Sequence, residues 1–153
     1  MPEINQLADT FVLNNRINLY LLNDIDDSYL KDLALSKGRT VGEQFAHIHN
    51  VRLMWLKAAA PQLLGSIEKI EKENAADKML LKMELEDSAH AIAQLLQQSE
   101  GKIKGFQPNA TAFLGYLIAH EAHHRGQIVL ILKENNHHLD KKVLFGLWEW
   151  GVR

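Results

Sequence analysis

Cysteine is absent from the 153-residue chain. Its absence excludes disulfide bonds, thiolate metal sites and cysteine nucleophiles. Any transition-metal site in this protein must therefore be built from imidazole, carboxylate and water ligands. The chain has eight histidines and 19 acidic residues from which such ligands could come.

Long apolar runs and blocks of basic residues are also missing. Residues 1–5 contain no basic region, and no uninterrupted apolar run follows them, so we predict neither a signal peptide nor a membrane span. The expected location is the cytoplasm. A formal net charge of -2 without a Lys/Arg block provides no electrostatic footprint for nucleic acid. We therefore expect a small-molecule substrate and neither a nucleic-acid nor a membrane partner.

Proline occupies only three positions, and hydrophobic residues make up 46% of the chain, which argues against disorder and low complexity. A chain of this length can bury roughly two thirds of its unfolded surface, so it needs no metal merely to hold it together. We predict a single domain that spans residues 1–153.

Apolar residues recur with helical periodicity in four segments, which predicts an all-α fold. Thr40 and Glu43 form a capping-box pattern at the start of the second segment, and Asp77 is a plausible cap for the third. The predicted helices cover residues 3–23, 41–59, 78–100 and 110–134. The Trp-rich segment that ends the chain, Val143–Trp150, is expected to pack on the helices or against a second subunit.

The first two predicted helices carry polar residues whose orientation matters. Asn14 and Asn18 interrupt the apolar stripe of the first helix, and we favour edge positions that reach water over the alternative of a polar cavity. In the second helix, the angular projection places His47 on the same face as Met54 and Trp55. It directs His49 about 150° away, and we expect His49 to be a solvated surface residue.

The fourth helix has two histidines in its buried row, His120 and His124. They lie one helical turn apart, roughly 6 Å between Cβ atoms, so two imidazoles can hold one ion. With His47 they provide three nitrogen donors, the number found in catalytic zinc-type sites. The alternative is three core histidines that each find a separate hydrogen-bond partner, and we favour the metal site. Nickel, zinc and iron all accept such donors.

The same residues satisfy the H-E-x-x-H pattern of metalloproteases, in which Glu121 would act as the general base. The extended metzincin form requires glycine at position 127 and histidine at position 130, where this chain has Gln127 and Leu130. No strand precedes the helix to bind an extended peptide. We therefore disfavour peptidase activity.

Three segments together, Thr40–Ile48, His120–Ile128 and Phe145–Gly151, resemble the DinB family of metalloenzymes. The resemblance implies a four-helix bundle, commonly dimeric, in which three histidines hold a divalent nickel or zinc ion. Carried over by position, these ligands are His47, His120 and His124. The family takes its name from a damage-inducible gene, which does not imply that this protein contacts DNA.

The related superfamily includes enzymes that use low-molecular-weight thiols, which makes a metal-dependent S-transferase with a detoxification role the leading expectation. Because the chain has no cysteine, the sulfur would come from the thiol cosubstrate. The alternatives are a hydrolase of a small amide or ester that uses metal-activated water, and a non-catalytic metal-binding dimeric stress protein. The sequence identifies no catalytic base, and it leaves open the roles of Glu121, His123 and Arg125.

Overall fold

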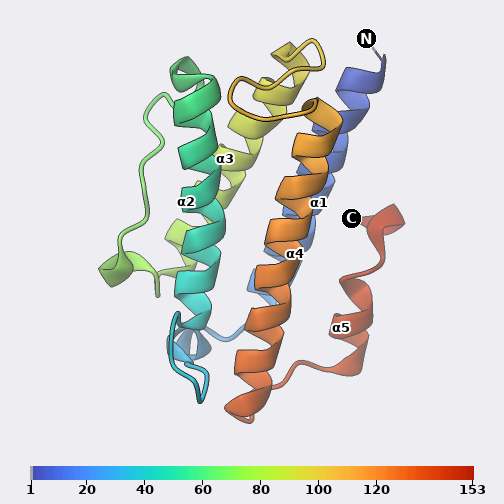
Figure 1. Ribbon diagram of the computed structural model, residues 1–153. Helices are drawn as coiled ribbons and strands as arrows, with labels where there is room; N and C mark the ends of the chain where they lie inside the picture. The colour runs from blue at the N-terminus through green and yellow to red at the C-terminus, as the bar shows by residue number, and fades with distance from the viewer. Residues whose placement is uncertain (1) are drawn as a thin grey trace.

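Four long helices form a bundle in this computed structural model, which describes residues 2–153 and side chains from Gln6 onward (Figure 1). The all-α prediction is confirmed. The bounds are α1 (Pro2–Asn23), α2 (Val41–Ala59), α3 (Lys78–Gln98) and α4 (Ala110–Glu134), followed by the short α5 (Lys141–Gly146). In Figure 1, α1 and α4 run in one direction, and α2 and α3 run in the other. Single-turn 3-10 helices cover Asp27–Lys31, Pro61–Leu63, Lys72–Asn74 and Trp150–Val152. Among the described residues, no helix combines the length and apolar character needed to cross a membrane.

The helix starts follow the capping residues of the sequence. Thr40 accepts a hydrogen bond from the Glu43 backbone N–H at 3.2 Å, and the Glu43 carboxylate accepts one from the Thr40 N–H at 2.9 Å, which confirms the capping box. Asp77 caps α3 through the Leu80 N–H at 3.0 Å. These caps satisfy backbone donors that the first turn leaves unpaired, and all four predicted helix starts lie within one residue of the observed ones.

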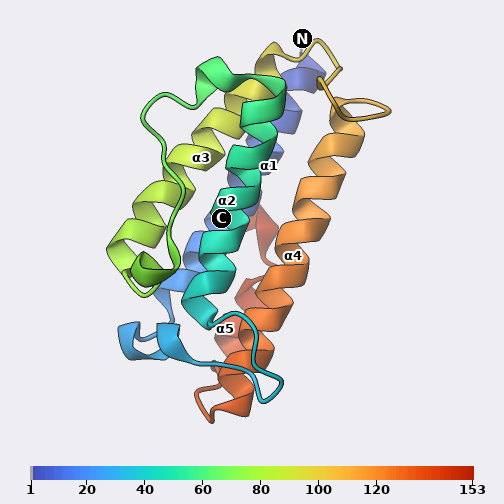
Figure 2. The same cartoon turned by 60° about the vertical axis from the view of Figure 1, so that its left-hand side comes forward.

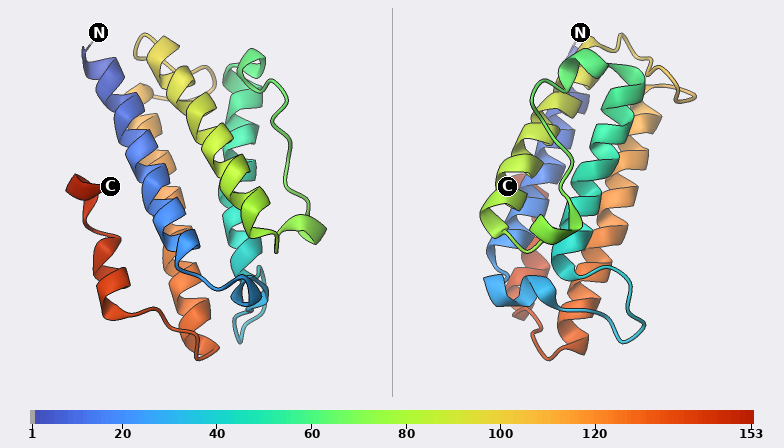
Figure 3. Two further views of the ribbon diagram at one scale, coloured as in Figure 1. Left: turned by 180° about the vertical axis from the view of Figure 1, so that it is seen from behind. Right: turned by 90° about the vertical axis from the view of Figure 1, so that its left-hand side faces the viewer.

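Within the bundle, α1 packs against α3 and α4, and α2 packs against the same two helices. Figures 2 and 3 show α2 and α4 side by side, with the segment after α2 running down the outer side of the bundle toward α3. This arrangement brings position 47 of α2 to the level of positions 120–124 of α4. The two predicted sources of metal ligands therefore face each other.

The buried core is divided by a polar layer. One apolar cluster includes Phe11, Leu56 and Phe113, and a second, toward the other end of the bundle, includes Phe45 and Ile128. Between the clusters, every long helix contributes buried polar side chains: Asn14, Asn15, Asn18, Arg52, Ser88, Glu121 and Arg125. The three candidate ligands, His47, His120 and His124, lie beside this layer.

The predicted orientation of α2 was wrong in part. Met54, expected on the buried face, is 56% exposed, whereas His49, expected in solvent, is fully buried. The segment that follows α2 covers this side of the helix, and the His49 ring lies 2.8 Å from the Glu68 carbonyl oxygen. A helical projection considers one helix alone and cannot show that another segment covers it. The projection therefore wrongly predicted that His49 is exposed.

The C-terminal segment packs on the bundle, as one of the two alternatives predicted. Tyr20 of α1 donates a hydrogen bond to the Val143 carbonyl at 3.2 Å, and the Arg153 guanidinium lies 3.8 Å from the Tyr20 ring centroid. Gly146 approaches Tyr20 so closely that a Cβ at position 146 would collide with the tyrosine hydroxyl. Seen from behind, the segment runs beside α1 (Figure 3). Trp148 nevertheless remains 82% exposed.

Candidate metal centre

Three histidine side chains from two helices converge between α2 and α4. Nε2 of His120 lies 3.4 Å from Nε2 of His47 and 3.1 Å from Nε2 of His124. One nitrogen from each of the three rings lies within 4.8 Å of the other two. The structure therefore brings together the three residues that the sequence proposed as ligands.

The spacing of these nitrogens fits a shared ion. At a metal–nitrogen distance of about 2.1 Å, two ligands separated by about 90° to 110° at the ion have nitrogens about 3.0 to 3.4 Å apart. The two shorter Nε2–Nε2 distances, 3.1 and 3.4 Å, fall in that range. Three separate core histidines would each need their own acceptor, and Nδ1 of His120 is buried with no hydrogen-bond partner in the described part of the chain.

Gln44, one helical turn before His47, fixes the orientation of one ring. His124 Nδ1 lies 2.6 Å from Gln44 Oε1, and since an amide oxygen only accepts, Nδ1 must carry the proton. Nε2 of His124 then presents its lone pair to the cluster. A hydrogen bond of this kind from the non-ligating nitrogen is the usual support of a metal-binding histidine.

The surroundings keep the three imidazoles neutral. Burial, together with the nearby Arg39 cation and the His120 ring, lowers the pKa of His47 to about 4. Burial and the neighbouring His120 and His47 rings likewise lower the pKa of His124 to about 4, and burial lowers the pKa of His120. Neutral imidazole is the form that binds a metal, so all three rings are in a ligating state near neutral pH.

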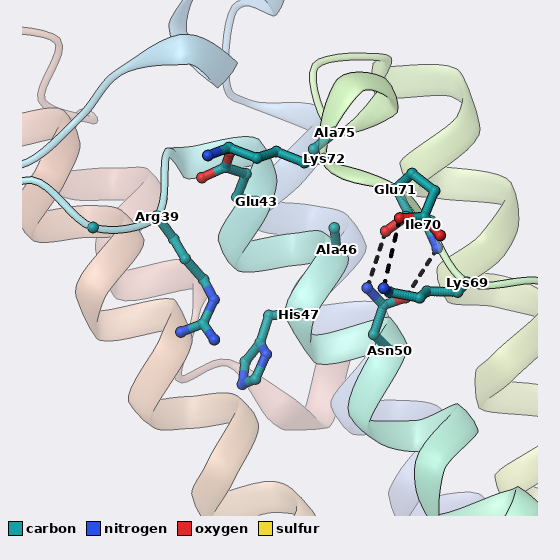
Figure 4. A pocket seen from close by; sticks show the side chains of 11 residues that line it. Arg39, Glu43, Ala46, His47, Asn50, Lys69, Ile70, Glu71, Lys72 and Ala75 are labelled. Atoms are coloured by element: carbon teal, nitrogen blue, oxygen red, sulfur yellow. Dashed lines mark hydrogen bonds and ion pairs between the residues drawn. The ribbon is translucent and has the colours of Figure 1, made fainter.

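A cavity of about 580 Å³ opens beside His47, between the loop before α2 and the segment after it. Figure 4 shows Arg39 extending toward the His47 ring, Lys72 next to Glu43, and Lys69 next to Glu71 on the side opposite Arg39. Asn50 holds the far wall through hydrogen bonds with the Ile70 backbone at 2.9 and 3.0 Å. The cavity is large enough for a small molecule, and three cations and two carboxylates line it.

Glu121, adjacent to His120, points away from the histidines into the polar layer and is fully buried. Its Oε1 accepts hydrogen bonds from Asn14 at 2.9 Å, Asn18 at 2.8 Å and Arg52 Nη2 at 2.6 Å. Its Oε2 accepts one from Arg52 Nε at 2.8 Å. All four donors lie inside the bundle, so the Glu121 carboxylate stabilises the fold. It is not directed at the histidines, and it therefore does not fit the general-base role that the H-E-x-x-H pattern suggests.

The surroundings of Glu121 favour its charged form. Burial alone would raise its pKa, but the Arg52 guanidinium and the hydrogen bonds from Arg52 and Asn18 hold the pKa below its usual value. Arg52 is itself fully buried and also donates to the Leu85 carbonyl, to Ser88 and to Asn15. The pair thus joins all four helices directly beneath the histidine cluster.

Asn14 and Asn18 were expected to reach water, and that expectation was wrong. Both are 0% exposed, and each bridges Glu121 and Arg125: the amide nitrogen donates to the glutamate, and the amide oxygen accepts from Arg125 Nη1 at 3.0 and 2.6 Å. Buried amides need partners for both ends, and oppositely charged neighbours on α4 supply them. The two amides therefore face the interior, but they belong to a packed hydrogen-bonded layer rather than to the polar cavity that was the alternative.

Sequence reasoning also missed Gln44, Arg52 and Arg39. Arg52 could have been found, because it lies at i+4 from the buried Ile48 and at i−4 from the buried Leu56. Gln44 lies three residues before His47, but its neighbour in space is His124 on a different helix. Arg39 belongs to a loop, for which helical periodicity gives no signal.

A family model described as the DinB family matches residues 1–138. Because this match covers well over half of the 153 residues, the chain belongs to the DinB family. The segment that contains α5 lies beyond the match. Searches of curated proteins and of solved structures found no match to the chain.

Proposed function

We propose that this DinB-family chain binds one divalent metal ion, nickel, zinc or iron, through His47, His120 and His124. The observation that carries the proposal is the convergence of three neutral Nε2 atoms at separations of 3.1 and 3.4 Å. A three-histidine set leaves coordination positions for a substrate. Gln44 orients His124, and the buried network around Glu121 holds α4 in place below the ligands.

We further propose a thiol-dependent S-transferase activity. A divalent ion in the site would lower the pKa of a thiol that reaches it, so that the thiolate is available near neutral pH. In the proposed reaction, the sulfur forms a bond to an electrophilic carbon, the leaving group departs with its electron pair, and the thiol proton passes to solvent. The cosubstrate supplies the sulfur because the chain has no cysteine.

The cavity beside His47 supports a small-molecule thiol as cosubstrate. Low-molecular-weight thiols of the peptide and sugar-acid kinds carry carboxylates, and Arg39, Lys69 and Lys72 line the cavity next to His47. In this proposal, the three cations bind the carboxylates and direct the sulfur toward the histidines. The substrate class is therefore a small anionic thiol together with an electrophile, without a nucleic-acid or membrane partner.

Metal analysis of the purified protein tests the site. We expect about one divalent ion per chain, and we expect it to be lost in His47→Ala and His124→Ala but retained in His123→Ala, whose side chain is exposed on the same helix. Circular dichroism establishes that each variant is folded. Full occupancy in both ligand variants would refute the metal site.

A thiol screen tests the reaction separately. Metal-replete protein is incubated with a series of low-molecular-weight thiols and a chloro-dinitrobenzene, and metal-dependent loss of thiol is measured. For the active thiol, Arg39→Ala is expected to raise KM without changing metal content, whereas Lys57→Ala, an exposed cation on α2, should change neither. Metal binding without thiol consumption would refute the transferase, and ester or amide turnover by the same protein would identify a hydrolase.

We also propose that the protein is a homodimer. Large apolar side chains are exposed, among them Met79 at 67%, Met83 at 51% and Phe145 at 70%. A contiguous partner surface would remove them from water. Light scattering on the purified protein is expected to give twice the chain mass of 17.4 kDa, and a mass of one chain at all concentrations would contradict the dimer.

A further inference from the structure

A second cavity, of about 360 Å³, lies between α4 and the C-terminal segment. Figure 1 shows α5 and the residues that follow it beside α4, connected to the end of α4 by the loop at the bottom of the view. The larger apolar side chains of its lining are Ile118, Val129, Leu144, Leu147, Trp148 and Trp150, and Ala122 and Gly126 of α4 complete the apolar part. No histidine of the candidate metal centre lines this cavity, so the two sites are distinct.

One charged side chain, Arg125, belongs to the lining of this otherwise apolar cavity. It is only 8% exposed, and a guanidinium has five N–H donors. Nη1 donates to Asn14 and Asn18. Among the described residues, Nε and Nη2 of Arg125 donate no hydrogen bond, and these nitrogens are not fully enclosed by protein. Since Arg125 lines the cavity, a ligand there can accept hydrogen bonds from them.

The charge balance of the polar layer also favours an anionic ligand next to Arg125. Two buried guanidiniums, Arg52 and Arg125, share one buried carboxylate, Glu121, whose oxygens bind Arg52 directly. Arg125 reaches Glu121 only through the Asn14 and Asn18 amides. The layer therefore has a net charge of plus one, and the under-compensated cation is the one at the cavity. Burial of a cation without a direct anionic partner is unfavourable, and an anion at this position would relieve it.

We propose that this cavity binds a small monocarboxylate with an aliphatic or aromatic body. The carboxylate accepts hydrogen bonds from Arg125 Nε and Nη2 in the bidentate arrangement that guanidinium favours, and the apolar body lies among the leucine and tryptophan side chains. The volume lies at the lower end of the range of about 300–1,000 Å³ seen for small-molecule sites, which suits a ligand of medium-chain or bicyclic size.

The wall formed by the C-terminal segment is held in place by contacts that do not involve the ligand. Tyr20 bonds to the Val143 carbonyl, the Arg153 guanidinium covers the Tyr20 ring and donates to the Gly146 carbonyl at 3.2 Å, and Gly146 itself packs on Tyr20. A wall fixed in this way forms the cavity before a ligand arrives. Less ordering is then required on binding.

Calorimetric titration of the full-length protein with octanoate and with 2-naphthoate tests the proposal. Both should bind with one site per chain, and the uncharged octanamide should bind at least about tenfold more weakly than octanoate, because it lacks the charge that Arg125 attracts. The emission of Trp148 and Trp150, which line the cavity, should change on saturation with 2-naphthoate or octanoate.

Two variants separate this site from adventitious binding. Ala122→Phe places a ring in the cavity from an exposed position of α4 and should abolish carboxylate binding, while Ala119→Phe, also exposed on α4 but outside the lining, should leave it unchanged. Arg125→Lys keeps the buried positive charge but removes the planar guanidinium, which can donate two parallel hydrogen bonds to a carboxylate. It should reduce the ratio of octanoate to octanamide affinity, an effect that loss of packing alone would not produce.

Equal affinity for octanoate and octanamide would overturn the role of Arg125. Undiminished binding to Ala122→Phe would show that the ligand occupies another place, and absence of saturable binding by either carboxylate would overturn the site. None of these outcomes depends on the metal or on thiol turnover, because the metal and thiol assays of the proposed function are measured separately.

Discussion

Replacing Glu121 with glutamine should destabilise the protein more than any loss of a single surface charge. The Glu121 carboxylate accepts four hydrogen bonds, two from Arg52 and one each from Asn14 and Asn18. Glutamine has nearly the same shape but only one acceptor oxygen, and its amide N–H₂ would face donors. Arg52 and Arg125 would then be buried with no anion in the layer.

The expected magnitude follows from the cost of an unpaired buried charge. Removing one partner of a buried ion pair typically costs about 3–5 kcal/mol, which is a large part of a total stability of about 5–15 kcal/mol. For a chain of this size, about 1 kcal/mol corresponds to about 2–4 °C in Tm, so Glu121→Gln should lower Tm by on the order of 10 °C.

Thermal and urea denaturation, followed by circular dichroism, measure the effect. Glu86→Gln, an exposed carboxylate on α3, is the matched control and should change stability by less than about 0.5 kcal/mol. The metal content of folded Glu121→Gln should equal that of the wild type, since Glu121 is not one of the three ligands. A Glu121→Gln protein as stable as the wild type would refute the reasoning about the buried network.

Four further variants test other parts of the structure. Gln44→Ala removes the hydrogen bond to His124 and should weaken metal affinity about 10- to 100-fold in a chelator competition. Unchanged affinity would show that Gln44 does not support metal binding. Gly42→Ala should lower Tm because its Cβ would collide with the Ala75 backbone, whereas Gly115→Ala, with open space around it, should raise stability by about 0.5–1 kcal/mol. His49→Ala should cost about 1–3 kcal/mol in urea denaturation, and a neutral effect would mean that His49 is not buried.

The sequence was sufficient for the helices and for the three converging histidines because both depend on local spacing. His120 and His124 share a helix, so their separation is fixed by helical geometry, and His47 required only that one other helix face them. Thr40 and Asp77 marked helix starts through hydrogen bonds made within a single turn. Such features do not depend on the rest of the fold.

The polar layer could not be predicted in the same way. Asn14 and Asn18 are favourable in the interior only because Glu121 and Arg125 from α4 satisfy both ends of each amide. Read one helix at a time, each of these side chains belongs on the surface. The prediction that His49 is exposed was wrong for the same reason, because its hydrogen-bond partner is a backbone carbonyl in a segment without helical periodicity.

The faces of α4 explain why one short motif suggested a different chemistry. His120 and His124 face α2, Glu121 lies about 100° around the helix from His120 and enters the polar layer, and Arg125 joins that layer from the side of the C-terminal segment. A protease motif requires the glutamate beside the metal. In this protein, the Glu121 side chain lies in the core and forms an ion pair with Arg52. The third histidine comes from α2. Neighbouring residues of this segment therefore point to the proposed metal centre, to a buried ion pair and to the proposed carboxylate site, on different faces of one helix.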